Sequence, residues 1–241
     1  MAGPHARIFL LSHMRAYTSL TGHLLGSHPE IDGYYEMHRS YRSPADLDRQ
    51  AAQYAASDRL KPGSRYLFDK LLHNDYTLDL DALGSAAAVV LVSVRAPLPT
   101  LKSIVHLFAG RTPDEPYADS VGAAMYYIER LQALTAFGTR YRGRYCYFDA
   151  ERLHGDPPGT LDWLGKRLEL GTPLSQRYQR FSKTGLAGAG DSSSAIGAGR
   201  VLDTVNSYPD IALDAASLAR AEQAYAACRA SLVAHAAASL S

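Results

Sequence analysis

A short stretch near the N-terminus, MRAYTSL (residues 14–20), places a permanent positive charge and two hydroxyl groups between an apolar run and a helical pattern. Arg15 supplies a planar guanidinium, and Thr18 and Ser19 supply hydroxyl donors. In a parallel α/β sheet such a turn lies at a strand's carboxyl end, where the following helix attracts anions. The stretch predicts a phosphate-binding loop, although Thr18 as a helix N-cap and Arg15 as a solvated charge also explain it taken alone.

A second arginine turn favours the phosphate interpretation. VSVRAPLPTLKS follows the most strongly apolar run of the chain, so Arg95 is expected at a second strand end. Ser103 comes eight residues later, about two turns into a helix that begins near Pro97. An arginine at the strand end and a serine on the next helix are suited to bind a second phosphate between them.

Strand and helix patterns alternate along the chain. Apolar runs predict strands at residues 8–11, 65–72, 86–95 and 144–149. Spaced apolar residues between turn signals predict helices at residues 18–27, 44–57, 78–83, 98–109, 119–141, 160–168 and 215–238. After a turn at Asp32-Gly33, a short strand or loop is expected to reach Glu36. The alternation predicts an α/β fold with a central parallel sheet, in one domain that spans residues 1–241.

The composition limits the classes of function. Hydrophobic residues make up 46% of the 241 residues and charged residues 20%, which is typical of a soluble globular protein. The net charge of +1 provides no overall field for nucleic acid or an anionic membrane, so any anion must be bound by a local site. We expect a cytoplasmic protein without a targeting segment or membrane span, because no apolar run is long enough for either.

The sequence shows no pattern typical of a metal site or of a hydrolase. Cys146 and Cys228 are too few and too isolated for a disulfide scaffold or a cysteine metal cluster, and the nine histidines are scattered. Neither a G-x-S-x-G elbow nor an H-E-x-x-H pair is present. We therefore expect no metal.

Both arginine turns resemble motifs of the sulfotransferases that use 3′-phosphoadenosine 5′-phosphosulfate (PAPS). The family's first strand ends in Pro-Arg/Lys-Ser-Gly-Thr/Ser-Thr/Ser-Leu, which binds the 5′-phosphosulfate, and MRAYTSL occupies that place here. A later strand ends in Arg-Asp-Pro, with a serine eight residues after the arginine, and both residues bind the 3′-phosphate. Here they become Arg95, in the sequence RAP, and Ser103. The segment ERLHGDPPGTLDWLGKRLELG also resembles the family's Tyr-Glu-Asp-Leu segment and the helix after it.

The resemblance implies that PAPS is the co-substrate and adenosine 3′,5′-bisphosphate (PAP) the product. The family's late Lys/Arg-x-Gly-x-x-Gly loop resembles SKTGLAGAGD, which places Lys183 and Gly185 near the 3′-phosphate. The cofactor-binding residues expected from the three motifs are Arg15, Ala16, Tyr17, Thr18, Ser19, Arg95, Ser103, Lys183, Thr184 and Gly185. The implied fold is the three-layer sulfotransferase fold, which is similar to that of the P-loop nucleotide kinases.

Two departures from the family pattern concern nucleotide binding. Ala16 and Tyr17 replace the family's Ser-Gly, and Tyr17 costs about 1–2 kcal/mol of strain if the glycine's backbone angles are kept. Ala150 stands where many relatives carry a tyrosine, so an adenine-stacking role there is absent. The glycine-rich segment 185–200 is either a flexible surface loop or a segment that closes over a ligand.

The resemblance implies two catalytic candidates, and their neighbours in the sequence add two more. Several branches of the family use a glutamate shortly after the first helix as the base, and Glu36 in GYYEMH occupies that place. His38 shares a face with Glu36 in a strand and is the alternative base, or a group that orients the acceptor. Lys70 lies where relatives often have a lysine after a strand, and is suited to neutralise charge on the bridging oxygen. His73 follows Lys70 at helical spacing as a further candidate.

The sequence therefore predicts an enzyme that moves a sulfuryl group from PAPS to a hydroxyl or amine of a small-molecule or glycan acceptor. Positioning and electrostatic stabilisation would supply most of the rate of such an in-line transfer. Two alternatives stay open. One is a P-loop-type kinase, although the first loop lacks that motif's glycines and lysine. The other is a non-catalytic nucleotide-binding relative. No nucleic-acid partner is expected, and the sequence predicts neither the identity of the acceptor nor the oligomeric state.

Overall fold

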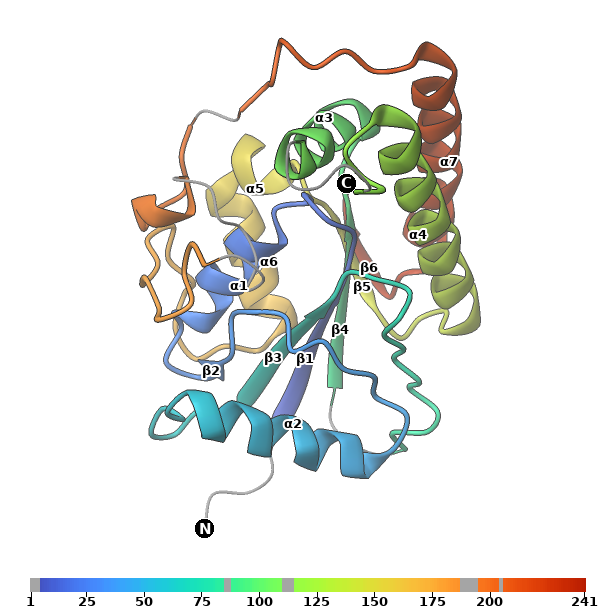
Figure 1. Ribbon diagram of the computed structural model, residues 1–241. Coiled ribbons are helices and arrows are strands. Elements are labelled where there is room, and N and C mark those ends of the chain that lie inside the picture. The colour runs from blue at the N-terminus through green and yellow to red at the C-terminus, as the bar shows by residue number, and fades with distance from the viewer. Residues whose placement is uncertain (1–4, 85–87, 110–114, 187–194, 204–205) are drawn as a thin grey trace.

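Six parallel strands form the central sheet, in the order β2-β3-β1-β4-β5-β6 (Figure 1). The computed structural model describes residues 5–84, 88–109, 115–186, 195–203 and 206–241. The strands are β1 (Ala6–Leu11), β2 (Ile31–Asp32), β3 (Tyr66–Leu71), β4 (Ala88–Val94), β5 (Cys146–Asp149) and β6 (Ala238–Leu240). The predicted α/β fold with a central parallel sheet is confirmed.

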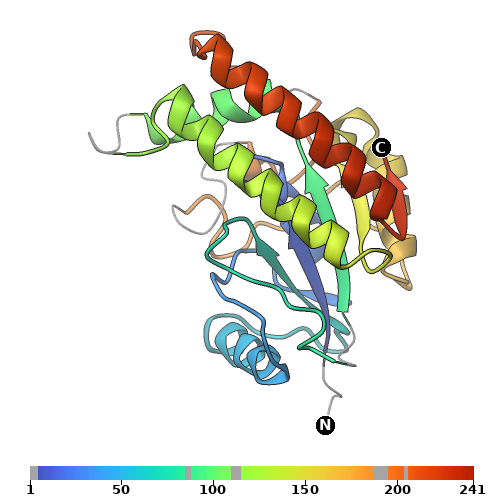
Figure 2. The same ribbon diagram turned by 90° about the vertical axis from the view of Figure 1, so that its right-hand side faces the viewer.

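Helices cover both faces of this sheet, which gives the predicted three layers (Figures 1 and 2). The helices are α1 (Thr18–Gly26), α2 (Pro44–Ser57), α3 (Pro97–Phe108), α4 (Ser120–Arg140), α5 (Arg152–Gly155), α6 (Pro157–Arg167), α7 (Ala215–His235) and the 3₁₀ helix η1 (Ile196–Ala198). Buried residues of α3, α4 and α7 pack together with one face of the sheet, and those of α1, α5 and α6 pack with the other.

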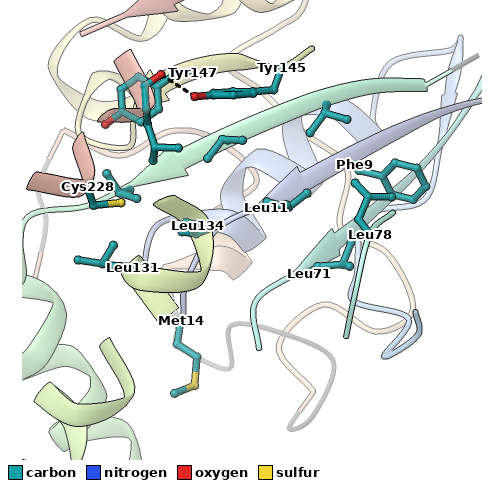
Figure 3. Packing of buried hydrophobic residues seen from close by; sticks show 14 of the residues in the cluster. Phe9, Leu11, Met14, Leu71, Leu78, Leu131, Leu134, Tyr145, Tyr147 and Cys228 are labelled. Carbon is teal, nitrogen blue, oxygen red and sulfur yellow. Dashed lines mark hydrogen bonds between the residues drawn. The ribbon is translucent and has the colours of Figure 1, made fainter. Parts of the chain in front are cut away.

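The central strand β1 is buried on both faces, as its unbroken apolar run predicts. Phe9 and Leu11 point to one side and pack in the cluster that contains Leu134 of α4 (Figure 3). Ile8 and Leu10 point to the other side and pack with the helices there. Side chains alternate between the faces of a strand, so each of the two layers contributes its own hydrophobic core.

The parallel arrangement brings three loops together at one edge of the sheet. β1 pairs with β3 on one side and with β4 on the other, and Leu11 lies opposite both Leu71 and Val92. All three strands therefore end at nearly the same level. Arg15 lies in the loop after β1, and Arg95 directly follows β4. Lys70 lies at the end of β3 itself. This edge is where ligands bind in α/β folds of this kind.

One predicted element is wrong, and another ends earlier than predicted. Residues 78–83 do not form a helix: Leu78 forms a β-bridge with Tyr41, and a series of turns follows. The N–H of Asp79 donates to the carbonyl of Tyr41 at 2.9 Å, so this backbone is paired with a distant loop rather than with itself. The last helix ends at His235 instead of continuing to residue 238, and the chain then forms β6 beside β5.

Candidate active site

The two arginine turns meet in the structure. Nε of Arg15 donates a hydrogen bond to Oγ of Ser103 at 2.8 Å, and Nη1 of Arg95 donates to the carbonyl oxygen of Arg15 at 2.9 Å. Arg95 and Ser103 are almost completely buried. Three residues from two separate motifs of the sequence therefore form one cluster at the carboxyl edge of the sheet.

The first turn is built on two residues with left-handed backbone angles. Arg15 has φ 63° and Tyr17 has φ 56°, and a bulky side chain at such an angle carries about 1–3 kcal/mol of strain. Tyr17 is the residue that replaces the family's glycine, so the predicted strain is present. Tyr17, not Thr18, is the N-cap of α1, and no side chain caps the first turn of that helix. The N-cap explanation of Thr18 is therefore wrong.

The ring of Tyr17 contacts the side chains of Arg95 and His154. The guanidinium carbon of Arg95 lies 4.1 Å from its centroid, and the ring of His154 lies 4.5 Å from it in an edge-to-face arrangement. A cation over an aromatic face is favourable by roughly 0.5–2 kcal/mol. The tyrosine at the glycine position thus helps to hold the Arg95 side chain in place.

A buried histidine connects the two turns. His13 has no exposed surface; its Nδ1 lies 2.8 Å from the carbonyl of Met14, and its Nε2 accepts the backbone N–H of Arg95 at 3.0 Å. Burial lowers the pKa of His13 to about 3, so the ring is neutral and serves as a spacer between the strand ends. The hydroxyl of Tyr127 donates to the carbonyl of Arg95 at 2.6 Å and fixes the second turn as well.

Lys70 adds a further positive charge to the cluster. It lies in β3 opposite Leu10 of β1, and its side chain is 1% exposed. Its Nζ donates to Oγ of Ser19, in the first turn of α1, at 3.1 Å. Two sets of contacts therefore lie along the ends of β1, β3 and β4. One joins Arg15, Arg95 and Ser103, and the other joins Lys70 and Ser19.

Glu36 lies in the loop after β2 and is 8% exposed. Its Oε1 is buried and has no hydrogen-bond partner in the part of the chain that the structure describes. Nδ1 of His38 lies 3.8 Å from this oxygen. The charge of Glu36 also raises the pKa of His73 and of Arg130 against the effect of their burial. A buried carboxylate oxygen without a donor is able to accept a proton from a ligand.

The two histidine candidates flank this carboxylate in different environments. His38 is exposed, has φ 51°, and packs its ring 5.7 Å from that of Tyr76. His73 is half-buried, with its ring 5.7 Å from that of Tyr126. Desolvation lowers the pKa of His73, and Glu36 opposes this effect. The surroundings of His73 therefore favour the neutral form of its ring.

Arg130 of α4 joins the ends of β1 and β3 through hydrogen bonds. It donates to the carbonyl oxygens of Ser12 at 2.8 Å and Leu71 at 2.6 Å, and to Oδ1 of Asn74 at 2.9 Å. Its side chain is nearly fully buried, and desolvation lowers its pKa. Nothing in its local sequence distinguishes Arg130 from an exposed helical arginine, so sequence reasoning missed this residue.

Asp69 positions the loop that carries Glu36. This residue has no exposed surface, and its Oδ1 accepts the backbone N–H of Met37 at 2.9 Å. Its Oδ2 accepts the hydroxyl of Tyr41 at 2.5 Å. Burial raises the pKa of Asp69 to about 7, although these hydrogen bonds favour the charged form. Asp69 thus holds the loop that carries Glu36 against the end of β3.

Asp69 leads to a prediction about stability and pH. Its pKa of about 7 in the folded chain lies above the ordinary 3.8, so the folded chain keeps a proton between these values that the unfolded chain loses. The stabilisation is complete below about pH 4 and is lost as the pH rises to 7. Relative to Asp69→Asn, the wild type should therefore lose at most about 4 kcal/mol of its free energy of unfolding over this range.

Urea denaturation of both chains between pH 4 and pH 8 measures this difference. His13 works in the opposite direction, because its lowered pKa makes the folded chain less stable as the pH falls below 6.5. His13 is present in both chains, so its effect cancels in the comparison. A difference between the two chains that stays constant from pH 4 to pH 8 would contradict the prediction.

The third predicted motif lies apart from these contacts. Nζ of Lys183 is 3.5 Å from Oδ2 of Asp58 and 3.6 Å from the ring centroid of Tyr35. Oγ1 of Thr184 is 2.8 Å from Nε2 of His23 in α1, and Gly185 follows with φ 79°. Half of the glycine-rich segment 185–200, residues 187–194, lies outside the described residues. The proposed contact of this motif with the 3′-phosphate stays a prediction.

Two further findings concern metals and membranes. Among residues 5–84, 88–109, 115–186, 195–203 and 206–241, no group of three His, Cys, Asp or Glu side chains is arranged to hold a metal ion. Within the same residues, none of the helices has the length and apolar character needed to cross a bilayer.

Known structures share this fold. No family model matches the chain, and no curated protein matches its sequence. The chain is similar to the sulfotransferase domain from the curacin biosynthetic pathway, with 16% identity, a TM-score of 0.61 and coverage of 92% of this chain and 98% of that one. It is also similar to the sulfotransferase domain from the Synechococcus PCC 7002 olefin synthase, with 17% identity, a TM-score of 0.64 and coverage of 94% and 96%. The protein therefore has the fold of these sulfotransferase domains, as the motifs predict.

Proposed function

We propose that this protein is a PAPS-dependent sulfotransferase that modifies a hydroxyl or amine of a small-molecule or glycan acceptor. The observation that carries the proposal is the pair of contacts that Arg15 makes, with Ser103 and with Arg95, at the carboxyl edge of a sheet with the sulfotransferase fold. Two arginines joined in this way suit a ligand with two separate anionic groups. Lys70 adds positive charge on the side of Ser19.

The residues present fit both ends of the nucleotide. Arg15, Ser19, Lys70 and the uncapped first turn of α1 are proposed to hold the 5′-phosphosulfate. Arg95 and Ser103 are proposed to hold the 3′-phosphate. Bound PAPS would supply the sulfuryl group, whose bond to the phosphate oxygen breaks as the bond to the acceptor oxygen or nitrogen forms.

In this proposal the side chains divide the work of catalysis. The buried oxygen of Glu36 accepts the proton of the acceptor, and His38 and His73 beside it orient that acceptor. Lys70 and Arg15 stabilise the negative charge that develops on the leaving phosphate. Their positions are set by hydrogen bonds in the folded chain, so little reorganisation is needed when a substrate binds.

Isothermal titration calorimetry tests the nucleotide part of the proposal. The protein is expected to bind PAP, and to bind it more tightly than ATP with magnesium. A preference for ATP with magnesium would favour the kinase alternative. Turnover is then measured as release of PAP from PAPS with a panel of alcohols, phenols, amines and glycans. Binding of PAP without turnover of any acceptor would favour a non-catalytic relative.

The division between the two arginines gives a sharper prediction. Arg95→Ala is expected to weaken the binding of PAP by roughly 10-fold or more, because a hydrogen-bonded charged contact contributes about 1.5–3 kcal/mol. Adenosine 5′-phosphosulfate lacks the 3′-phosphate, so its affinity should change little. Calorimetry with both ligands checks this. Equal losses for the two ligands would show that Arg95 does not recognise the 3′-phosphate.

A further inference from the structure

Tyr208 reaches the proposed phosphate site from a distant part of the chain. It lies in the segment 206–211, on the path from η1 to α7, which passes over α3 (Figure 1). Its ring lies 4.4 Å from the ring of His106, and its carbonyl oxygen accepts a hydrogen bond from Nζ of Lys102 at 3.3 Å. Lys102 and His106 flank Ser103 on α3, so Tyr208 is held beside that serine.

The hydroxyl of Tyr208 faces the arginine cluster. It interacts with the Ser103 hydroxyl and with the Arg15 guanidinium, and its charge state also affects Arg95. Nδ2 of Asn206 donates to the same hydroxyl at 3.5 Å. Burial raises the pKa of Tyr208, but the hydrogen bonds and the charge of Arg15 outweigh it, so the pKa lies below its ordinary value. The surroundings of this oxygen therefore favour negative charge.

Two features of the backbone and surface suggest that this position serves a ligand. Tyr208 has φ 49°, a left-handed angle that is unfavourable for an aromatic residue, and strained backbone of this kind clusters at active sites and ligand clamps. It also lines a cavity of about 470 Å³, together with His106 and the rest of residues 206–211. A dissolved molecule can therefore approach the Tyr208 side chain.

We propose that the Tyr208 hydroxyl is a further phosphate-binding group, which donates to the same 3′-phosphate as Arg95 and Ser103 and so helps to select nucleotides that carry it. This inference rests on the proposed function. A phenol that is more acidic than usual is a better donor to an anion, and its ring is already fixed on His106. Neither the arginine motifs nor the glycine-rich loop contains this residue.

Tyr208→Phe tests the proposal because it removes the hydroxyl and keeps the ring. Calorimetry is performed with PAP and with adenosine 5′-monophosphate, which lacks the 3′-phosphate. The variant is expected to bind PAP roughly 10-fold more weakly, with the affinity for adenosine 5′-monophosphate unchanged. Tyr225→Phe is the matched control, since Tyr225 packs half-buried against the core on α7, and it should alter neither affinity.

Other outcomes overturn the proposal. Tighter binding of PAP by Tyr208→Phe would show that the hydroxyl competes with the phosphate. An equal loss for both nucleotides would show that Tyr208 only supports the local structure. Both results leave the proposed function in place, because the wild type still binds PAP. Failure of the wild type to bind PAP would instead refute the proposed function itself, and this inference with it.

Discussion

Glu36→Gln is expected to lower turnover by roughly 10²–10⁴-fold and to leave the affinity for PAP nearly unchanged. Glutamine keeps the shape of the side chain but has no carboxylate to accept a proton. The wild-type Oε1 is buried without a hydrogen-bond partner in the described part of the chain, so it is available to an acceptor. Steady-state release of PAP, with calorimetry on the same variant, measures both quantities.

The histidines provide the competing outcome for this experiment. His38→Ala is expected to raise the KM for the acceptor more than it lowers kcat. The reason is that Nδ1 of His38 lies 3.8 Å from Glu36 and the ring is exposed to solvent, where an acceptor can reach it. Glu129→Gln, on the exposed side of α4, is the matched control and should behave as the wild type. Near-normal turnover in Glu36→Gln together with a collapse in His38→Ala would transfer the role of base to the histidine.

The arginine turns were predictable because their signal is local. An apolar run followed by an arginine and hydroxyl residues marks a strand that ends in a binding loop, wherever the rest of the chain goes. Parallel pairing of β1 with β3 and β4 then brings Arg15, Lys70 and Arg95 to one edge. The contacts between these residues follow from this topology, and the sequence motifs already identify each member.

The groups that hold the site in place were not predictable in the same way. Asp69 lies inside an apolar strand, and only the packing of the residue 37–41 loop against β3 turns it into a positioning residue. Arg130 and Tyr208 reach the site from α4 and from the segment before α7. Their roles depend on contacts between residues far apart in the sequence, which no local pattern encodes.

The wrong element at residues 78–83 has a similar cause. Leu78, Leu80 and Leu83 are all buried, so their spacing does record a side that faces the core. The backbone there pairs with Tyr41 and forms turns, and the apolar side chains pack from a loop rather than from a helix. Short apolar patterns report burial more reliably than they report the type of backbone.

Lys70→Met is expected to lower turnover by roughly 10²–10³-fold, because it removes a positive charge placed to stabilise the leaving phosphate. Lys70 is 1% exposed, and methionine fills a similar volume without a charge in the protein interior. If the Lys70 ammonium served only structure, its removal would lower the stability of the chain. If the buried charge is instead kept for a ligand, its desolvation costs stability, and an apolar replacement is neutral or stabilising. We therefore expect a loss of activity in a chain whose free energy of unfolding is unchanged or higher.

Urea denaturation and PAP-release kinetics on Lys70→Met measure the two effects separately. Lys61→Met is a matched control at the opposite end of the sheet, where Nζ of Lys61 donates to the carbonyl of His28 at 2.9 Å. That variant should lose stability and keep the turnover of its folded fraction, because its ammonium satisfies backbone carbonyls far from the arginine cluster. If Lys70→Met instead lost stability and kept normal turnover, the role of Lys70 would be to hold the end of β3 to α1 through Ser19. The negative charge on the leaving phosphate would then be stabilised by the arginines alone.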